Sequence, residues 1–130
     1  MNKEIIKATG SSLYIAFDVD DTLIVPGIAY DRDVDTPNYE TIAIYNWFKK
    51  QGYHMIIWSG GGEDYARMWG TKLGLDPHEY RTKAQCDDID IAFDDSTFLD
   101  LGAKVNVRVK RINNKVVRYP ERAEKHRDGK

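Results

Sequence analysis

The feature that most limits how this chain can fold is a short apolar run, residues 13–17, which ends directly in the carboxylates of Asp18, Asp20 and Asp21. A run of about five apolar residues closed by polar ones is typical of a strand buried in a parallel sheet. In open α/β sheets, ligands bind at the carboxyl ends of such strands. Asp18 and Asp20 are two residues apart, so in an extended strand they point the same way. Because close carboxylates repel each other unless a cation or a shared proton relieves them, the pair predicts a metal ion and a candidate carboxylate nucleophile.

The rest of the chain alternates helix and strand patterns. Thr36 followed by Pro37 combines a capping hydroxyl with proline at the first helical position, and this helix is expected to run to about Lys50. Its expected core-facing residues are Ile44, Tyr45, Trp47 and Phe48. Further expected elements are a buried strand over 53–58, a helix over 63–73, a strand over 89–93 and a short helix over 96–102. Strands that alternate with helices predict a parallel α/β sheet, whose strand order the sequence does not reveal.

The end of the chain has the pattern of a β-hairpin. Val105, Val107 and Val109 alternate with polar residues, as in a half-exposed strand. The pair Asn113-Asn114 tolerates positive φ and can turn the chain into a second strand over 115–119. We therefore expect one domain over residues 1–119, followed by a charged tail over 120–130.

Composition excludes several classes of protein. With 42% hydrophobic and 31% charged residues, the chain suits a globular enzyme or binding domain rather than a disordered segment. No apolar stretch approaches the roughly 20 residues of a membrane span, and the N-terminus lacks a secretory signal. A single cysteine, Cys86, cannot form an internal disulfide, so a cytoplasmic location is expected. Residues 1–103 are acidic and residues 104–130 are basic, a pattern of either a nucleic-acid contact or a solvated tail.

Polar residues follow the expected strands at positions that suit phosphate chemistry. Magnesium prefers hard oxygen ligands, which Asp18, Asp94 and Asp95 could supply. Lys83 would balance the acids and steady a transferring phosphoryl group. Ser59, with the backbone N–H groups of Gly60 and Gly61, could bind phosphate oxygens at a helix N-terminus. Each of these residues alone also fits a structural role, as a cap, a turn or a surface lysine, so only their joint order favours a site.

Residues 18–23, DVDDTL, after the apolar run resemble the first motif (DxDxT) of the haloacid dehalogenase (HAD) superfamily. Ser59 is similar to the second motif, Lys83 to the third and Asp94-Asp95 to the fourth, over about residues 12–103. The resemblance implies a Rossmann-like three-layer sandwich with a mainly parallel central sheet. It also implies a phosphatase that uses Mg²⁺ and an aspartyl-phosphate intermediate.

The same resemblance assigns roles to residues. Asp18 would be the nucleophile, and Asp20 would protonate the leaving oxygen and then activate water. Asp18, the backbone carbonyl of Asp20, and Asp94 or Asp95 would hold magnesium. The phosphate-binding residues would be Thr22, Ser59, Gly60 and Lys83. Asp21 stands where glycine is frequent in the family.

The spacing of the motifs leaves no room for a cap domain, either between Thr22 and Ser59 or between Ser59 and Lys83. An open site suits a bulky substrate, such as a phosphorylated nucleic-acid end or protein, or a small one enclosed by oligomerisation. The basic C-terminal segment favours a nucleotide or polynucleotide phosphate.

Two other classes of protein carry similar acidic residues on a parallel sheet. A response-regulator receiver would need its phosphorylated Asp at the end of a middle strand, where this chain has Trp58 and Ser59. A catalytically silent HAD-like module that binds phosphate or nucleic acid retains the same residues and differs only in turnover. Trp58, beside Ser59, is expected to pack in the core rather than line the site.

Overall fold

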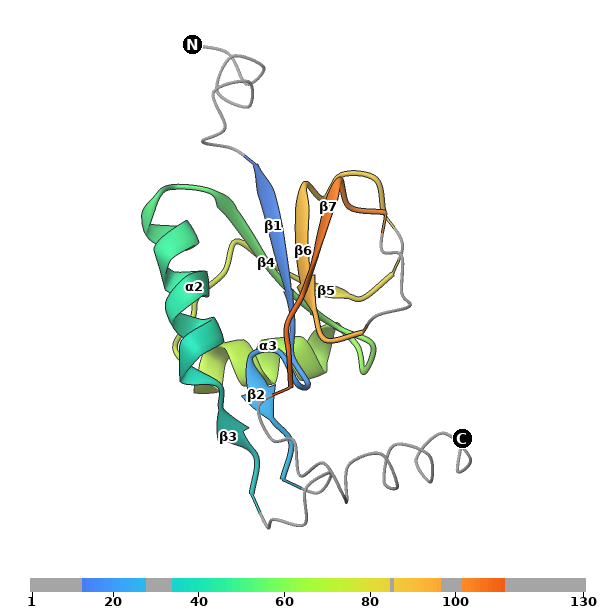
Figure 1. The fold of residues 1–130 in the computed structure, drawn as a ribbon. Helices are drawn as coiled ribbons and strands as arrows, with labels where there is room; N and C mark the ends of the chain where they lie inside the picture. Colours follow the sequence, from blue (N-terminus) through green and yellow to red (C-terminus); the bar gives the residue numbers. More distant parts are fainter. Residues whose placement is uncertain (1–12, 28–33, 85, 97–101, 112–130) are drawn as a thin grey trace.

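A five-stranded parallel sheet forms the centre of the molecule (Figure 1). The computed structural model describes residues 13–27, 34–84, 86–96 and 102–111. The sheet order is β5-β4-β1-β6-β7, so β1 lies in the middle. Its strands are β1 (Tyr14–Asp18), β4 (His54–Ser59), β5 (Glu79–Thr82), β6 (Ile91–Asp94) and β7 (Val105–Arg108). The expected parallel α/β sheet is therefore confirmed.

Both helices of the described residues pack on one face of this sheet. Helix α2 spans Tyr39–Lys50 and helix α3 spans Glu63–Lys72. Tyr45 of α2 and Trp69 of α3 share one buried cluster with Phe17 of β1. Because side chains of a strand alternate between its faces, the residues between these core positions form a second, smaller cluster on the opposite face. That second cluster contains Ala16, Ile56, Trp58, Ile89 and Ala92, so Trp58 is a core residue as expected.

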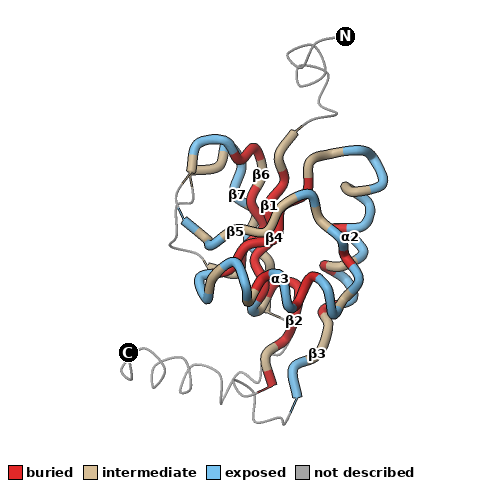
Figure 2. The backbone as a smooth tube through the Cα atoms, turned by 180° about the vertical axis from the view of Figure 1, so that it is seen from behind, coloured by how far each residue is buried: buried red, intermediate tan, exposed pale blue. Residues whose placement is uncertain are grey.

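The second face has no helix among the described residues. The connection from β5 to β6 runs through residues 83–90, and its described part contains neither a helix nor a strand. The described residues thus show two layers, and the third layer implied by the family resemblance stays a prediction. Figure 2 shows how burial is distributed: the central strands are mostly buried, whereas α2 and α3 each present an exposed side.

The start of α2 differs from the expected one. Thr36–Pro37 is not the first turn of the helix but forms β3, which pairs antiparallel with β2 (Ile24–Val25). The helix begins at Tyr39, and the side chain of Asn38 accepts a hydrogen bond of 3.3 Å from the N–H of Thr41. Asn38 is held there because its own N–H donates to the carbonyl of Leu23 and its amide donates to the carbonyl of Thr22. Capping thus moves from Thr36 to Asn38, because Thr36 is engaged by β2.

The expected core face of α2 is only partly right. Tyr45 is fully buried and Phe48 packs against the core, but Ile44 is 45% exposed and Trp47 is 56% exposed. Thr41, Tyr45 and Phe48 lie within about 60° of one another at 100° per residue, so they define the face that meets the sheet. Ile44 and Trp47 fall on its flank. The helix carries apolar side chains over a wider arc than the sheet covers.

The remaining elements follow the expectations with one omission. Helix α3, β4, β6 and β7 lie where their patterns placed them, and Gly52 and Gly74 follow the helices with positive φ. Strand β5 was missed, because its sequence, EYRT, has no apolar run. It lies at an edge of the sheet, where a strand needs no continuous apolar sequence. The second strand of the expected hairpin (115–119) and the tail (120–130) lie outside the described residues, as does most of the expected helix over 96–102.

The region before α2 contains no further domain among the described residues. Between β1 and α2 the structure shows only the small β2–β3 sheet, which lies near the carboxyl end of β1 (Figure 1). None of the described helices is long and apolar enough to cross a membrane.

Candidate active site

Three carboxylates meet at the topological switch point of the sheet, where the strand order reverses next to β1. From β1 the chain crosses through α2 to β4 on one side, whereas β6 pairs with the other side of β1. Ligands of open α/β sheets bind at the carboxyl ends of strands at such a point. Phe17 of β1 is aligned with Phe93 of β6, so the next residues, Asp18 and Asp94, are neighbours. Oxygens of Asp18, Asp94 and Asp95 all lie within 4.8 Å of one another, in a group that could hold a metal ion.

Lys83 bridges two of these acids. Its Nζ atom lies 3.2 Å from Oδ1 of Asp18 and 3.0 Å from Oδ2 of Asp94. The lysine comes directly after β5 and its backbone N–H donates to the carbonyl of Ser59 at 2.8 Å. Its position beside the acids is therefore set by the pairing of β4 with β5, which the sequence pattern did not predict. The edge strand β5 thus brings Lys83 next to Asp18 and Asp94.

Burial and like charge make the acidic cluster costly without a cation. Asp18 and Asp94 are only 4% and 6% exposed. Burial, followed by the charge of Asp94, raises the pKa of Asp18 to about 8, although Lys83 acts in the opposite direction. Burial alone would lower the pKa of Lys83, but the charges and hydrogen bonds of Asp18 and Asp94 outweigh it and raise that pKa. One ammonium group therefore does not neutralise the carboxylates that surround it.

A tight turn follows β1 and returns Thr22 to the first carboxylate. The buried Thr22 places its hydroxyl 3.4 Å from Oδ2 of Asp18, a long contact. Asp21 within the turn has φ of 62°, the left-handed region that favours glycine and that aspartate tolerates better than most residues. Aspartate therefore meets the conformational demand of this position without glycine. The turn leaves the backbone of Asp18 to Thr22 folded around the cluster.

Asp20 lies apart from the three clustered carboxylates. Its side chain is exposed, and its Oδ1 accepts a hydrogen bond of 2.7 Å from the hydroxyl of Tyr65 in α3. Partial burial raises the pKa of Asp20, and the bond from Tyr65 opposes that increase. The pKa of Tyr65 is also raised, by burial and by Asp20, so its hydroxyl keeps its proton at physiological pH. The side chains of Asp18 and Asp20 thus have different surroundings despite their spacing of two residues.

Ser59 and the glycines after it form a turn that is largely satisfied internally. The N–H of Gly61, one of the two expected phosphate donors, donates to Oγ of Ser59 at 2.9 Å. Gly60 lies beside the lysine: a Cβ placed on it would be 4.0 Å from Cε of Lys83. The structure therefore places Ser59 and Gly60 next to Lys83, while the Ser59 hydroxyl already accepts a hydrogen bond within its own turn. The hydroxyl of Thr82 accepts the N–H of Glu63 at the start of α3.

Arg111 is a residue of the site that sequence reasoning missed. Its guanidinium approaches Oδ2 of Asp95 through Nη2 at 2.7 Å and through Nε at 2.9 Å, and it lies 3.7 Å from Asp21. The chain reaches this position because β7 runs parallel to β6 and ends at the same edge of the sheet. In the sequence Arg111 is one of several basic residues, and no local signal separates it from the others. Tyr65 was also missed, although its place in the first turn after the glycines is a usable signal.

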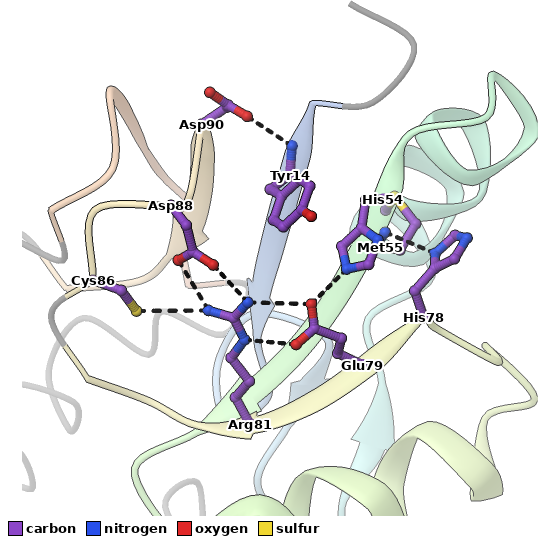
Figure 3. Close-up of polar contacts among 9 residues, drawn as sticks. All are labelled: Tyr14, His54, Met55, His78, Glu79, Arg81, Cys86, Asp88 and Asp90. Atoms are coloured by element: carbon purple, nitrogen blue, oxygen red, sulfur yellow. Dashed lines mark hydrogen bonds and ion pairs between the residues drawn. The ribbon is translucent and has the colours of Figure 1, made fainter. Parts of the chain in front are cut away.

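A second group of charged side chains lies on the face of the sheet opposite the helices, beside β4 and β5 (Figure 3). Arg81 donates to the carboxylates of Glu79 and Asp88 at 2.8–3.1 Å. His54 also contacts Glu79, and its ring stacks on that of His78. The bonds from Arg81 are the largest cause that lowers the pKa of Glu79, so Arg81 stabilises the charged form of this carboxylate. None of these residues was expected to form a site.

Comparison of the chain with family models, with curated proteins and with solved structures found no match.

Proposed function

We propose that this protein is a magnesium-dependent phosphomonoesterase of the HAD type that works through an aspartyl-phosphate on Asp18. The observation that carries the proposal is the buried, like-charged cluster of Asp18, Asp94 and Asp95 at the switch point of the sheet, with Lys83 between two of its members. Burial of repelling carboxylates destabilises a fold, so such a cluster is better explained by a ligand than by stability.

The donor set fits magnesium. Mg²⁺ is held in proteins by one or two carboxylates together with phosphate and water oxygens. Asp18 and either Asp94 or Asp95 would hold it, and because burial and the charge of Asp94 raise the pKa of Asp18, a bound cation would favour its charged form. Each of the two has a cation beside its Oδ2, Lys83 at Asp94 and Arg111 at Asp95, so the second ligand could be either carboxylate. When bound, the ion would screen the phosphate from the attacking carboxylate.

The side chains then supply two proton transfers and one nucleophile. A carboxylate oxygen of Asp18 forms a bond to phosphorus while the bond from phosphorus to the leaving oxygen breaks, and that oxygen takes a proton from the carboxyl group of Asp20. In the second step Asp20 takes a proton from water, whose oxygen bonds to phosphorus as the bond to Asp18 breaks. Lys83 stabilises the charge on the transferring phosphoryl group. The products are an alcohol and inorganic phosphate.

The substrate is expected to reach an uncovered site. The described residues between β1 and α2 form only the small β2–β3 sheet, so the substrate could be a nucleotide, a polynucleotide end or a small phosphorylated metabolite. Contact of the basic C-terminal segment with nucleic acid stays a prediction, as do oligomerisation and the cytoplasmic location. The described part of that segment contributes Arg111 to the site itself.

The test is phosphate release by wild type and Asp18→Asn, with and without Mg²⁺, over one panel of substrates. The panel holds an aryl phosphate, nucleoside monophosphates, sugar phosphates and a 3′-phosphorylated oligonucleotide. Release that requires both Mg²⁺ and Asp18 supports the proposal, and the fastest substrate indicates the class. Wild-type activity in Asp18→Asn contradicts the mechanism, and stable phosphate binding without release by folded protein supports a silent binding module instead.

A further inference from the structure

The hydroxyl of Tyr65 donates a short hydrogen bond to Asp20, 45 residues away in the sequence. The distance from the hydroxyl to Oδ1 of Asp20 is 2.7 Å. Tyr65 is the third residue of α3, and Asp20 is the second residue after β1. The bond therefore joins the turn after one strand to the first turn of the helix that follows another.

This bond holds a side chain that packing does not hold. Asp20 is exposed, whereas Asp18 two residues earlier is buried and fixed by its neighbours. Among the described residues, Tyr65 is the one group that hydrogen-bonds the Asp20 carboxyl. An exposed aspartate without such a partner samples several rotamers. The bond from Tyr65 favours the rotamer that places Oδ1 within reach of its hydroxyl.

The ring of Tyr65 is itself well placed to act as a fixed support. A Cβ on Gly61 would lie 3.4 Å from the ring, so the ring rests against the backbone at a position without a side chain. The N–H of Ala66, the next residue, donates to the carbonyl of Gly62 at the start of α3. The hydroxyl thus projects from a rigid first helical turn.

We propose that Tyr65 is a positioning residue that orients Asp20 for proton transfer to the leaving group, a role that rests on the proposed phosphatase function. Because Oδ1 accepts the tyrosine proton, the acidic proton of Asp20 must reside on Oδ2, which has no partner among the described residues. That proton therefore points away from the tyrosine and remains available to the leaving oxygen. Misplacement of a catalytic group by a small distance lowers a rate by large factors.

The alternative is that the bond only ties α3 to the turn after β1. The two roles differ in how they depend on the leaving group. A 4-nitrophenolate departs without a proton, whereas an alkoxide needs one, so loss of a positioned acid slows hydrolysis of an alkyl phosphate selectively. A structural defect slows both substrates alike. The value of kcat/KM is the proper measure, since it covers the steps up to release of the alcohol.

The experiment compares Tyr65→Phe with wild type on 4-nitrophenyl phosphate and on glycerol 3-phosphate. We expect kcat/KM for the alkyl ester to fall by about 10- to 100-fold, a part of the 10²–10⁴-fold usual for general acid catalysis, and that for the aryl ester to fall by less than about 3-fold. The matched control is Tyr45→Phe, which removes a hydroxyl bonded to the carbonyl of Leu75 at 3.1 Å on the helical face of the sheet. This control should leave the ratio of the two rates unchanged.

A second measurement separates failure of this inference from failure of the proposed function. The χ1 couplings of Asp20, measured by NMR, should report one rotamer in wild type and averaging in Tyr65→Phe, whether or not any substrate is turned over. Equal loss on both esters, or an Asp20 rotamer that the substitution does not change, overturns the role of Tyr65. Full activity of Asp18→Asn on both esters instead overturns the phosphatase mechanism, and the NMR result then still decides whether Tyr65 orders Asp20.

Discussion

Two regions of the central sheet gather charged side chains from several strands, but their effects on carboxylate pKa values are opposite. On the face opposite the helices, Arg81 lies between Glu79 and Asp88, and all three are partly exposed (Figure 3). At the carboxyl end, Asp18 and Asp94 are buried with Lys83 as the ammonium between them. The pKa of Glu79 is lowered, whereas that of Asp18 is raised to about 8.

The direction of these pKa shifts separates stabilisation from function. A lowered carboxylate pKa means that the folded state favours the charged form, so the network around Arg81 contributes to stability at neutral pH. A raised pKa means that the folded state resists the charge on Asp18, so the carboxyl end is maintained at a cost in stability. Many charges in contact are thus not in themselves a sign of a site. Excess charge of one sign in a buried place is the informative feature.

The largest expected difference concerns activity after the same chemical change in each region. Asp94→Asn should lower kcat/KM for phosphate release by more than about 100-fold, because it removes a carboxylate from the candidate metal cluster. Asp88→Asn, in the network around Arg81, should lower it by less than about 2-fold, because exposed pairs contribute little. Steady-state kinetics on the best substrate measures both. Comparable losses in the two variants would mean that the charge imbalance does not mark the site.

The next effect concerns stability and pH without metal. Asp18 binds its proton more tightly in the folded state than in the unfolded state, so the free energy of unfolding should fall as pH rises from about 4 to about 8. The slope contributed by this one group is at most about 1.4 kcal/mol per pH unit. Urea unfolding in EDTA at several pH values measures it. Asp18→Asn should remove this contribution, and millimolar Mg²⁺ should reduce it; a slope unaffected by both changes would contradict the assignment.

A smaller effect, on the free energy of unfolding, is expected from substitution of Arg81. Arg81→Gln breaks charged hydrogen bonds to two carboxylates and should lower the free energy of unfolding by about 1–2 kcal/mol, with unchanged kcat/KM. The matched control is Arg67→Gln, which breaks the exposed pair with Glu63 on α3 and should cost at most about 0.5 kcal/mol. Denaturant unfolding compares the two. Equal costs would show that the network around Arg81 is no more than surface pairing.

The smallest expected effect is a slight loss of stability as pH falls. His78 accepts the N–H of Met55 through Nδ1, and partial burial together with His54 and Lys49 lowers its pKa, against the opposing charges of Asp76 and Glu79. The unfolded state therefore binds a proton first as pH falls below the usual histidine value of about 6.5, and stability should decrease slightly there. His78→Gln should flatten the Tm profile between pH 7 and 5. An unchanged profile would show that the exposed ring protonates without consequence.

Much of the fold follows from local patterns. The apolar runs before Asp18, Ser59 and Asp94 predicted three buried strands, because a strand buried on both faces needs a continuous apolar sequence. Helix α3 was predicted from its glycine boundaries, since Gly74 takes the positive φ that ends it. The acids and Lys83 were also found in the sequence, and the structure brings four of them together.

Local sequence patterns did not predict which strands pair or which distant side chains come into contact. Strand β5 has a polar sequence and exists because β4 offers an unpaired edge, and that pairing alone brings Lys83 to Asp18. Thr36 pairs with β2, so Asn38 caps the helix instead. The position of β7 likewise brings Arg111 to Asp95. The sequence by itself determined which residues carry the chemistry, because short-range patterns fix strand ends and residue types. Only the tertiary structure decided which charges meet, which are buried and which residue supports Asp20, because those depend on strand order and on contacts between residues far apart in the chain.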